Sequence, residues 1–187
     1  MNLPNKLTVL RIILVPFFIL FLLLPNIPHN NLWALIIFAI ASITDMLDGK
    51  IARKYNLITN FGKFLDPLAD KMLVVSALIC FIELNFVSSI AVVIIVAREF
   101  LVTSLRLIAA GEGTVIAAGS LGKIKTVVQM VAIIMIMISA EIEYIGVSLP
   151  INPMMISNIV MWVAVALTIL SGAVYLYQNR NAISPNK

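Results

Sequence analysis

The sequence predicts an all-α membrane protein whose six transmembrane helices form a single domain over residues 1–187. The first observation behind this prediction is composition: 61% of the residues are hydrophobic, 12% are charged, and the mean hydropathy is +1.07. Soluble domains average about 45–50% apolar and about 25% charged residues, so a water-soluble core could not bury this much apolar surface. The other two observations are long apolar runs and a one-sided distribution of basic residues.

Six apolar segments are long enough to cross a bilayer, which takes about 20 residues of helix, with a range of about 17–25. The predicted spans are 7–24, 32–48, 66–83, 87–110, 121–141 and 154–177. The first span resembles a signal peptide. Its apolar stretch, however, continues to Leu24 and ends without a small-residue cleavage pattern, so we expect an uncleaved helix.

The Lys and Arg residues predict the orientation of these spans, because cytoplasmic loops carry an excess of basic residues. An even number of spans places both termini on one side, and all 13 basic residues favour that side. The opposite connectors hold only His29, Glu83, Glu141 and Glu143 as acidic or histidine side chains. Both termini are therefore predicted to be cytoplasmic. The expected surroundings of the chain are membrane lipids, and we expect no nucleic-acid partner.

All four aspartates of the chain fall in one segment, TDMLDGKIARKYNLITNFGKFLDPLADK, residues 44–71. Asp45, Asp48 and Ala52 are spaced i, i+3, i+7, which places them on one face of a helix. Gly49 lies near this face, and its missing side chain lets a ligand approach the backbone closely.

The second half of the segment has a similar spacing. Gly62, Asp66 and Asp70 are spaced i, i+4, i+8, which again places them on a single helical face. Two antiparallel helices joined by the short basic connector around 54–60 can bring the two faces together. We therefore expect four carboxylates to converge at the cytoplasmic end of the second and third spans.

Carboxylates grouped partly out of water repel one another and take up protons unless cations compensate them. Oxygen ligands favour hard divalent ions such as Mg²⁺ or Mn²⁺. Four carboxylates suit two ions about 3.5–4 Å apart, the arrangement that clamps a phosphoryl centre. The alternative is a set of solvated aspartates paired with neighbouring basic residues, namely Lys50, Arg53, Lys63 and Lys71. The two glycines on the same faces favour the metal site.

Written as a pattern, the segment is D-x2-D-G-x2-A-R-x8-G-x3-D-x3-D. It resembles the signature of the CDP-alcohol phosphotransferase family at every fixed position. Those positions are Asp45, Asp48, Gly49, Ala52, Arg53, Gly62, Asp66 and Asp70. Residues 2–8 ahead of Arg11, and 98–103 through 121–126, are similar to bacterial members whose acceptor is sn-glycerol 3-phosphate.

The resemblance implies that CDP-diacylglycerol donates its phosphatidyl group to sn-glycerol 3-phosphate, with release of CMP. It implies that Asp45, Asp48 and Asp66 hold two Mg²⁺ or Mn²⁺ ions, and that Asp70 is both a metal ligand and the general base. The residues that it implies for CDP-lipid binding are Gly49, Ala52, Arg53, Gly62, Asn5 and Thr8. A homodimer in the bacterial cytoplasmic membrane is implied as well.

Basic residues within predicted spans are candidates for binding the acceptor phosphate. Arg98 falls in the middle of the fourth span, where a charge costs roughly 2.5–3.5 kcal/mol and is usually paired or functional. Arg106 follows at i+8, and Lys123 and Lys125 open the fifth span. Arg binds phosphate bidentately, so we predict that these four residues bind the acceptor phosphate. Alternatively, Arg98 pairs with Glu99 or an aspartate, and Lys123 snorkels to lipid headgroups.

Two other functions remain open from the sequence. The aspartate motif is silent on the acceptor, which could be inositol phosphate, serine or phosphatidylglycerol. A divalent-cation transporter would also contain intramembrane acids, but Arg98, Arg106 and the nearby lysines would repel its cargo, and the aspartates gather at one membrane face.

Overall fold

The computed structural model describes residues 2–54, 60–111, 119–147 and 149–180, and for 3–4, 48–54, 60–68 and 70 it describes the backbone alone. Over these residues the chain forms six helices, which confirms the all-α prediction, and each predicted span overlaps one of them. The helices are α1 Leu3–Leu23, α2 Asn30–Lys54, α3 Asn60–Glu83, α4 Ser89–Gly111, α5 Ser120–Ile145 and α6 Pro153–Gln178.

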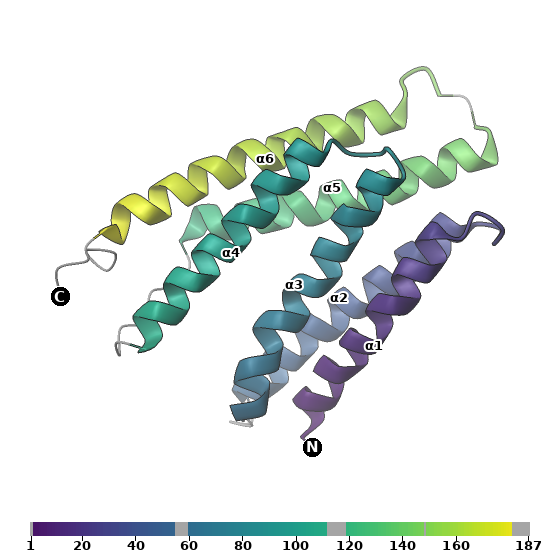
Figure 1. Cartoon of the computed structure of the whole chain (residues 1–187). Coiled ribbons are helices and arrows are strands. Elements are labelled where there is room, and N and C mark those ends of the chain that lie inside the picture. The colour runs from purple at the N-terminus through teal and green to yellow at the C-terminus, as the bar shows by residue number, and fades with distance from the viewer. Residues whose placement is uncertain (1, 55–59, 112–118, 148, 181–187) are drawn as a thin grey trace.

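Four helices are long and apolar enough to cross a membrane over the described residues: α1, α2, α5 and α6. Helix α4 carries Arg98, Glu99 and Arg106 within its 23 residues, and much of α3 is described only by its backbone. That α3 and α4 also span the membrane stays a prediction. The start of α1 and the end of α6 lie at the same end of the helices (Figure 1), as an even number of crossings requires.

Local sequence signals account for several helix ends. Helix α6 begins where the Asn152 side chain accepts a hydrogen bond from the Met154 amide at 2.8 Å, with Pro153 in the first turn. Helix α5 ends at Gly146, whose φ of 75° lies in the left-handed region that glycine adopts without steric cost. These signals fix where the chain turns between the last two helices.

The helices pack as two groups that lie side by side. Helix α1 packs against α2 and α3, whereas α6 packs against α5 and α4 (Figure 1). Contact between α2 and α5 joins the groups, and α3 makes few backbone contacts with α4 or α5. At the predicted outer end, His29 Nδ1 lies 2.5 Å from Oε1 of the buried Glu141, which ties the α1–α2 connector to α5.

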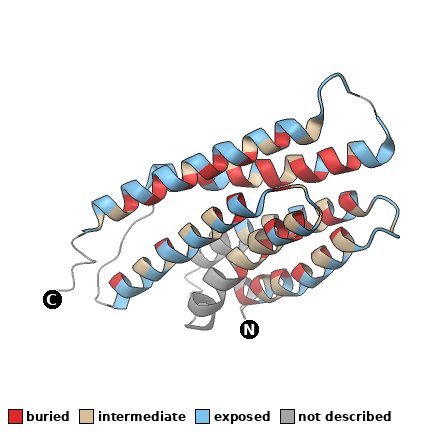
Figure 2. Cartoon of the chain, turned by 45° about the horizontal axis from the view of Figure 1, so that its top comes forward, coloured by how far each residue is buried: buried red, intermediate tan, exposed pale blue. Residues whose placement is uncertain are grey.

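The core runs between the two groups and is built from large apolar side chains. Phe18 and Phe38 are fully buried, with ring centroids 5.8 Å apart, and Ile133 and Met137 bury against the same cluster from α5. Exposed residues, pale blue in Figure 2, cover the outward faces of most helices, and many of them are large and apolar. A water-facing protein rarely exposes such extended apolar surface, so these faces contact lipid. In lipid, tight packing between helices supplies the stability.

We predict that Ala132→Phe destabilises the fold, because Ala132 is 0% exposed at the centre of the core. Overpacking costs about 1–3 kcal/mol, so the thermal midpoint in detergent should fall. Cys80 is the single cysteine of the chain and is 4% exposed, so labelling of its thiol during heating reports unfolding. The matched control is Val131→Phe, because Val131 is 45% exposed. Equal losses for the two variants would contradict this packing.

Candidate active site

The aspartate segment occupies the end of α2 and the start of α3. Asp45 and Asp48 lie on α2, and Asp66 and Asp70 lie on α3, so each pair is helical as its spacing predicts. Figure 1 shows the end of α2 beside the start of α3. Of the four side chains the structure describes only that of Asp45. The convergence of the carboxylates is therefore still a prediction. The structure describes four further motif residues by their backbone alone: Gly49, Ala52, Arg53 and Gly62.

Helix α1 presents a buried polar face to this end of α2. Arg11 is 1% exposed, and its Nη1 lies 2.5 Å from Oδ1 of Asp45. Asn5 and Thr8, which sequence analysis assigned to CDP-lipid binding, are buried at 7% and 1% exposure on the same helix. The sequence interpretation did not give Arg11 a role. Its signal was the three-residue spacing of Asn5, Thr8 and Arg11, which places three polar side chains near one face of an apolar helix.

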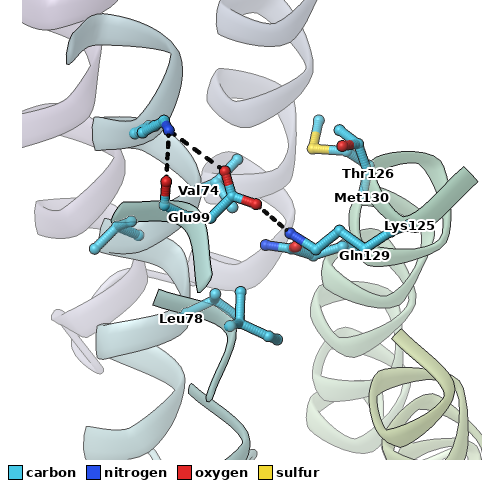
Figure 3. A pocket seen from close by; sticks show the side chains of 10 residues that line it. Val74, Leu78, Glu99, Lys125, Thr126, Gln129 and Met130 are labelled. Atoms are coloured by element: carbon cyan, nitrogen blue, oxygen red, sulfur yellow. Dashed lines mark hydrogen bonds and ion pairs between the residues drawn. The ribbon is translucent and has the colours of Figure 1, made fainter. Parts of the chain in front are cut away.

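A second charged site is centred on Glu99 of α4. Glu99 Oε1 lies 2.5 Å from Lys125 Nζ on α5 (Figure 3), and Oε2 lies 3.5 Å from Lys71 Nζ on α3. Oε1 also lies 3.1 Å from Arg98 Nη1. We call these four residues the Glu99 cluster. Lys71 also donates to the Glu99 carbonyl at 3.2 Å and to the Thr103 hydroxyl. The cluster therefore connects three helices through one carboxylate.

Arg98 is enclosed by small residues of α5 and α6. Its Nη2 donates to Ser171 Oγ at 3.2 Å. A Cβ added at Gly172 would lie 3.2 Å from Arg98 Cγ, and one added at Gly122 would lie 3.6 Å from Nη2. Glycine at both positions leaves room for the guanidinium between the helices. The pairing of Arg98 with Glu99 is the alternative that sequence analysis kept open for this residue.

The four predicted acceptor-site cations are not all brought together. Arg98 and Lys125 meet at Glu99, and Lys125 is only 1% exposed. Arg106 lies farther along α4, where its Cζ is 5.6 Å from the centre of the Tyr175 ring, a cation–π distance. Lys123 is exposed and outside the Glu99 cluster. The structure adds Lys71, which sequence analysis had considered only as a partner for the aspartates.

A cleft lies beside the Glu99 cluster, between α3 and α4 on one side and α5 on the other. Lys71, Glu99 and Lys125 line its polar part, and Val74 and Leu78 of α3 line its apolar part (Figure 3). Gln129, one turn after Lys125, also faces this cleft. Its buried Oε1 makes no hydrogen bond among the described residues. The cleft thus combines cationic groups with an acceptor oxygen that a ligand hydroxyl could satisfy.

Comparison with known proteins defines the class. Residues 1–170 match the family described as CDP-alcohol phosphatidyltransferase, and the chain belongs to that family. It is 44% identical over 193 residues to the CDP-diacylglycerol–glycerol-3-phosphate 3-phosphatidyltransferase of Bacillus subtilis (strain 168), a match that covers 97% of each chain. It is 40% identical over 177 residues to the protein of the same name from Rickettsia felis, with 93% of each chain covered. These matches confirm the resemblance that the aspartate motif indicated.

Proposed function

We propose that this chain transfers the phosphatidyl group of CDP-diacylglycerol to sn-glycerol 3-phosphate, which yields phosphatidylglycerophosphate and CMP. The observation that carries the proposal is the aspartate signature on α2 and α3, combined with a buried cluster of cations on α3, α4 and α5. Relatives named for this reaction, 44% and 40% identical over almost the whole chain, support it.

The donor half of the reaction is assigned to the aspartate segment. Carboxylate oxygens are the ligands that Mg²⁺ and Mn²⁺ prefer, and the described member, Asp45, is 44% exposed and so accessible to an ion. Asp45, Asp48, Asp66 and Asp70 would hold two such ions, which when bound neutralise charge on the phosphate and on the departing CMP. Arg11 fixes Asp45 from the side of α1. The residues that would border CDP-diacylglycerol are Asn5, Thr8, Gly49, Ala52, Arg53 and Gly62.

Asp70 is assigned as the general base. It removes the proton of the acceptor hydroxyl as that oxygen attacks the phosphorus atom between the lipid and CMP. The new P–O bond joins the acceptor to the phosphatidyl group, the old P–O bond to CMP breaks, and CMP leaves with the bonding electron pair. Helix α3 therefore carries both the base and, one residue later, Lys71 of the Glu99 cluster.

The charge of the Glu99 cluster supports a phosphorylated acceptor. Three cations against one carboxylate leave a net charge of two positive units at a largely buried site. A phosphate monoester carries about −1.5 to −2 charges at pH 7, so glycerol 3-phosphate would neutralise the cluster. Free serine would leave it uncompensated. Arg98 and Lys125 are the proposed phosphate ligands, with Arg106 and Lys123 nearer the cytoplasmic ends of α4 and α5.

The remaining proposals concern the setting of the enzyme. All 13 basic residues favour one side of the membrane, which supports cytoplasmic termini. The family match over residues 1–170 supports a single domain. Membership in the family supports a homodimer, and bacterial relatives support the bacterial cytoplasmic membrane.

We predict that the purified protein in detergent releases CMP from CDP-diacylglycerol only when an acceptor and a divalent ion are both present. A chelator should abolish release, and Mg²⁺ or Mn²⁺ should restore it. In a panel of glycerol 3-phosphate, inositol phosphate, serine and phosphatidylglycerol, glycerol 3-phosphate should have the highest kcat/KM. Preference for another acceptor would refute the assigned substrate, and ion flux in liposomes without CMP release would refute an enzyme altogether.

Asp70→Asn should lower kcat by about 10²–10⁴-fold, the range that general-base catalysis contributes, because the amide cannot take the hydroxyl proton. Binding of CDP-diacylglycerol should be largely retained, as equilibrium binding in the presence of Mg²⁺ would measure. If the variant instead loses metal and donor binding together, Asp70 is chiefly a ligand.

Gly172→Ala should raise the KM for glycerol 3-phosphate by roughly 3–10-fold and leave the KM for CDP-diacylglycerol unchanged. The reason is the 3.2 Å approach of the added Cβ to Arg98 Cγ, which displaces the guanidinium. The matched control is Gly111→Ala on α4, where an added Cβ meets no atom within 4 Å. An equal change in both KM values would remove Arg98 from the acceptor site.

A further inference from the structure

We propose that Glu99 is a positioning residue. Its carboxylate holds the acceptor-binding cations of α4 and α5 at a fixed place relative to α3, the helix that carries Asp66 and Asp70. This inference rests on the acceptor site proposed above. It assigns a role to an acidic residue of the acceptor site, although the residues that bind the phosphate itself are basic.

The first support is the number of elements that one carboxylate joins. Glu99 Oε1 lies 2.5 Å from Lys125 Nζ of α5 and 3.1 Å from Arg98 Nη1 of α4. Its Oε2 lies 3.5 Å from Lys71 Nζ of α3. Figure 3 shows the Glu99 carboxylate of α4 between the ammonium groups of α3 and α5. Charge-assisted hydrogen bonds of this kind are about twice as strong as neutral ones.

The second support is that α3 lies at some distance from α4 and α5 beside Glu99, although side chains of all three helices share the apolar core. Helix α3 packs against α1, and α4 packs against α6, while backbone contacts of α3 with α4 and with α5 are few. The cleft beside Glu99 separates α3 from α5 at the same level (Figure 3). At the level of this cleft, the bridge from Lys71 through Glu99 to Lys125 is therefore a polar link between α3 and α5, in addition to the apolar packing of the core.

The third support is that two of the three cations have a second anchor. Lys71 donates to Thr103 and to the Glu99 carbonyl, and Arg98 donates to Ser171. Lys125 has Glu99 as its charge partner among the described residues, and it is 1% exposed. Removing one partner from a buried pair leaves an uncompensated charge, which is strongly unfavourable. Lys125 is thus the cation most dependent on Glu99 for its place.

A competing role for Glu99 predicts the opposite sign. If its carboxylate merely occupies the position of the acceptor phosphate, removing its charge would free Lys125 and Arg98 and lower the KM for glycerol 3-phosphate. If Glu99 positions these cations, removing its charge leaves three positive groups repelling one another and raises that KM. The observed sharing of Glu99 among three helices favours the positioning role.

The test is Glu99→Gln, which retains shape and loses charge. We expect the KM for glycerol 3-phosphate to rise roughly tenfold or more, the equivalent of about 1.4 kcal/mol per factor of ten, with the KM for CDP-diacylglycerol changed by less than about twofold. The matched control is Glu143→Gln, an exposed acid at the far end of α5, which should leave both values unchanged. A KM for glycerol 3-phosphate that falls or stays the same in Glu99→Gln overturns the inference.

Coupling to α3 is tested with Lys71→Met and the double variant. If Lys71 acts through Glu99, the double variant should be scarcely worse than the more affected single variant, because residues of one network are not additive. Fully additive effects would overturn the bridge to α3. If Glu99→Gln does not fold, Glu99→Asp keeps the charge and shortens the side chain. It should still raise the KM for the acceptor, and a wild-type KM would overturn the inference.

Lys125→Met separates failure of this inference from failure of the acceptor site itself. If Lys125→Met leaves the KM for glycerol 3-phosphate unchanged, the proposed acceptor site is wrong and the inference falls with it. If Lys125→Met raises this KM while Glu99→Gln does not, the acceptor site stands and only the positioning role of Glu99 is refuted.

Discussion

A charge buried away from water is costly unless a partner compensates it, and this constraint shapes both polar sites of the chain. Arg11, almost fully buried on α1, meets Asp45 of α2. Lys125, equally buried on α5, meets Glu99 of α4. Each pair lies on different helices, so satisfying the charge also fixes how two helices sit together. The ion pairs therefore compensate buried charges and also help to hold the helices in position.

The two pairs belong to the two packing groups in different ways. The pair of Arg11 and Asp45 lies inside the α1–α2–α3 group, whose helices also share an apolar core. The Glu99 cluster instead extends between groups, from α3 to α4 and α5, beside the cleft that separates α3 from α5. An apolar interface between helices in lipid is stabilised mainly by close van der Waals packing. A carboxylate shared by several cations instead sets the distance from its oxygens to each cation. A polar bridge is thus suited to a place where a cleft must stay open to a ligand.

The sequence was sufficient to predict the elements and the class of site, because both depend on short-range information. Apolar run length predicts helices, and the spacing of Asp45 and Asp48 predicts a shared helical face. The arrangement of helices depends on side chains far apart in the chain. Lys71 and Thr103 are 32 residues apart, and Lys125 and Glu99 are 26 apart. Spacing within one helix carries no information on such pairs, so Glu99 was foreseen only as a neighbour of Arg98 and Lys71 only as a partner of aspartates.

The same distinction bears on how one family can use different acceptors. The aspartate motif occupies a continuous segment on two successive helices, so the spacing of each pair along its helix is set locally. The proposed acceptor cations come from α4 and α5, and they contact α6, through Ser171 and Gly172, and are linked to α3, through Lys71 and Glu99. A change at any of these positions can alter the place of Arg98 or Lys125 without touching an aspartate. Acceptor choice is therefore expected to follow the residues that support the cations as much as the cations themselves, and the carboxylate of Glu99 is the point where these supports meet.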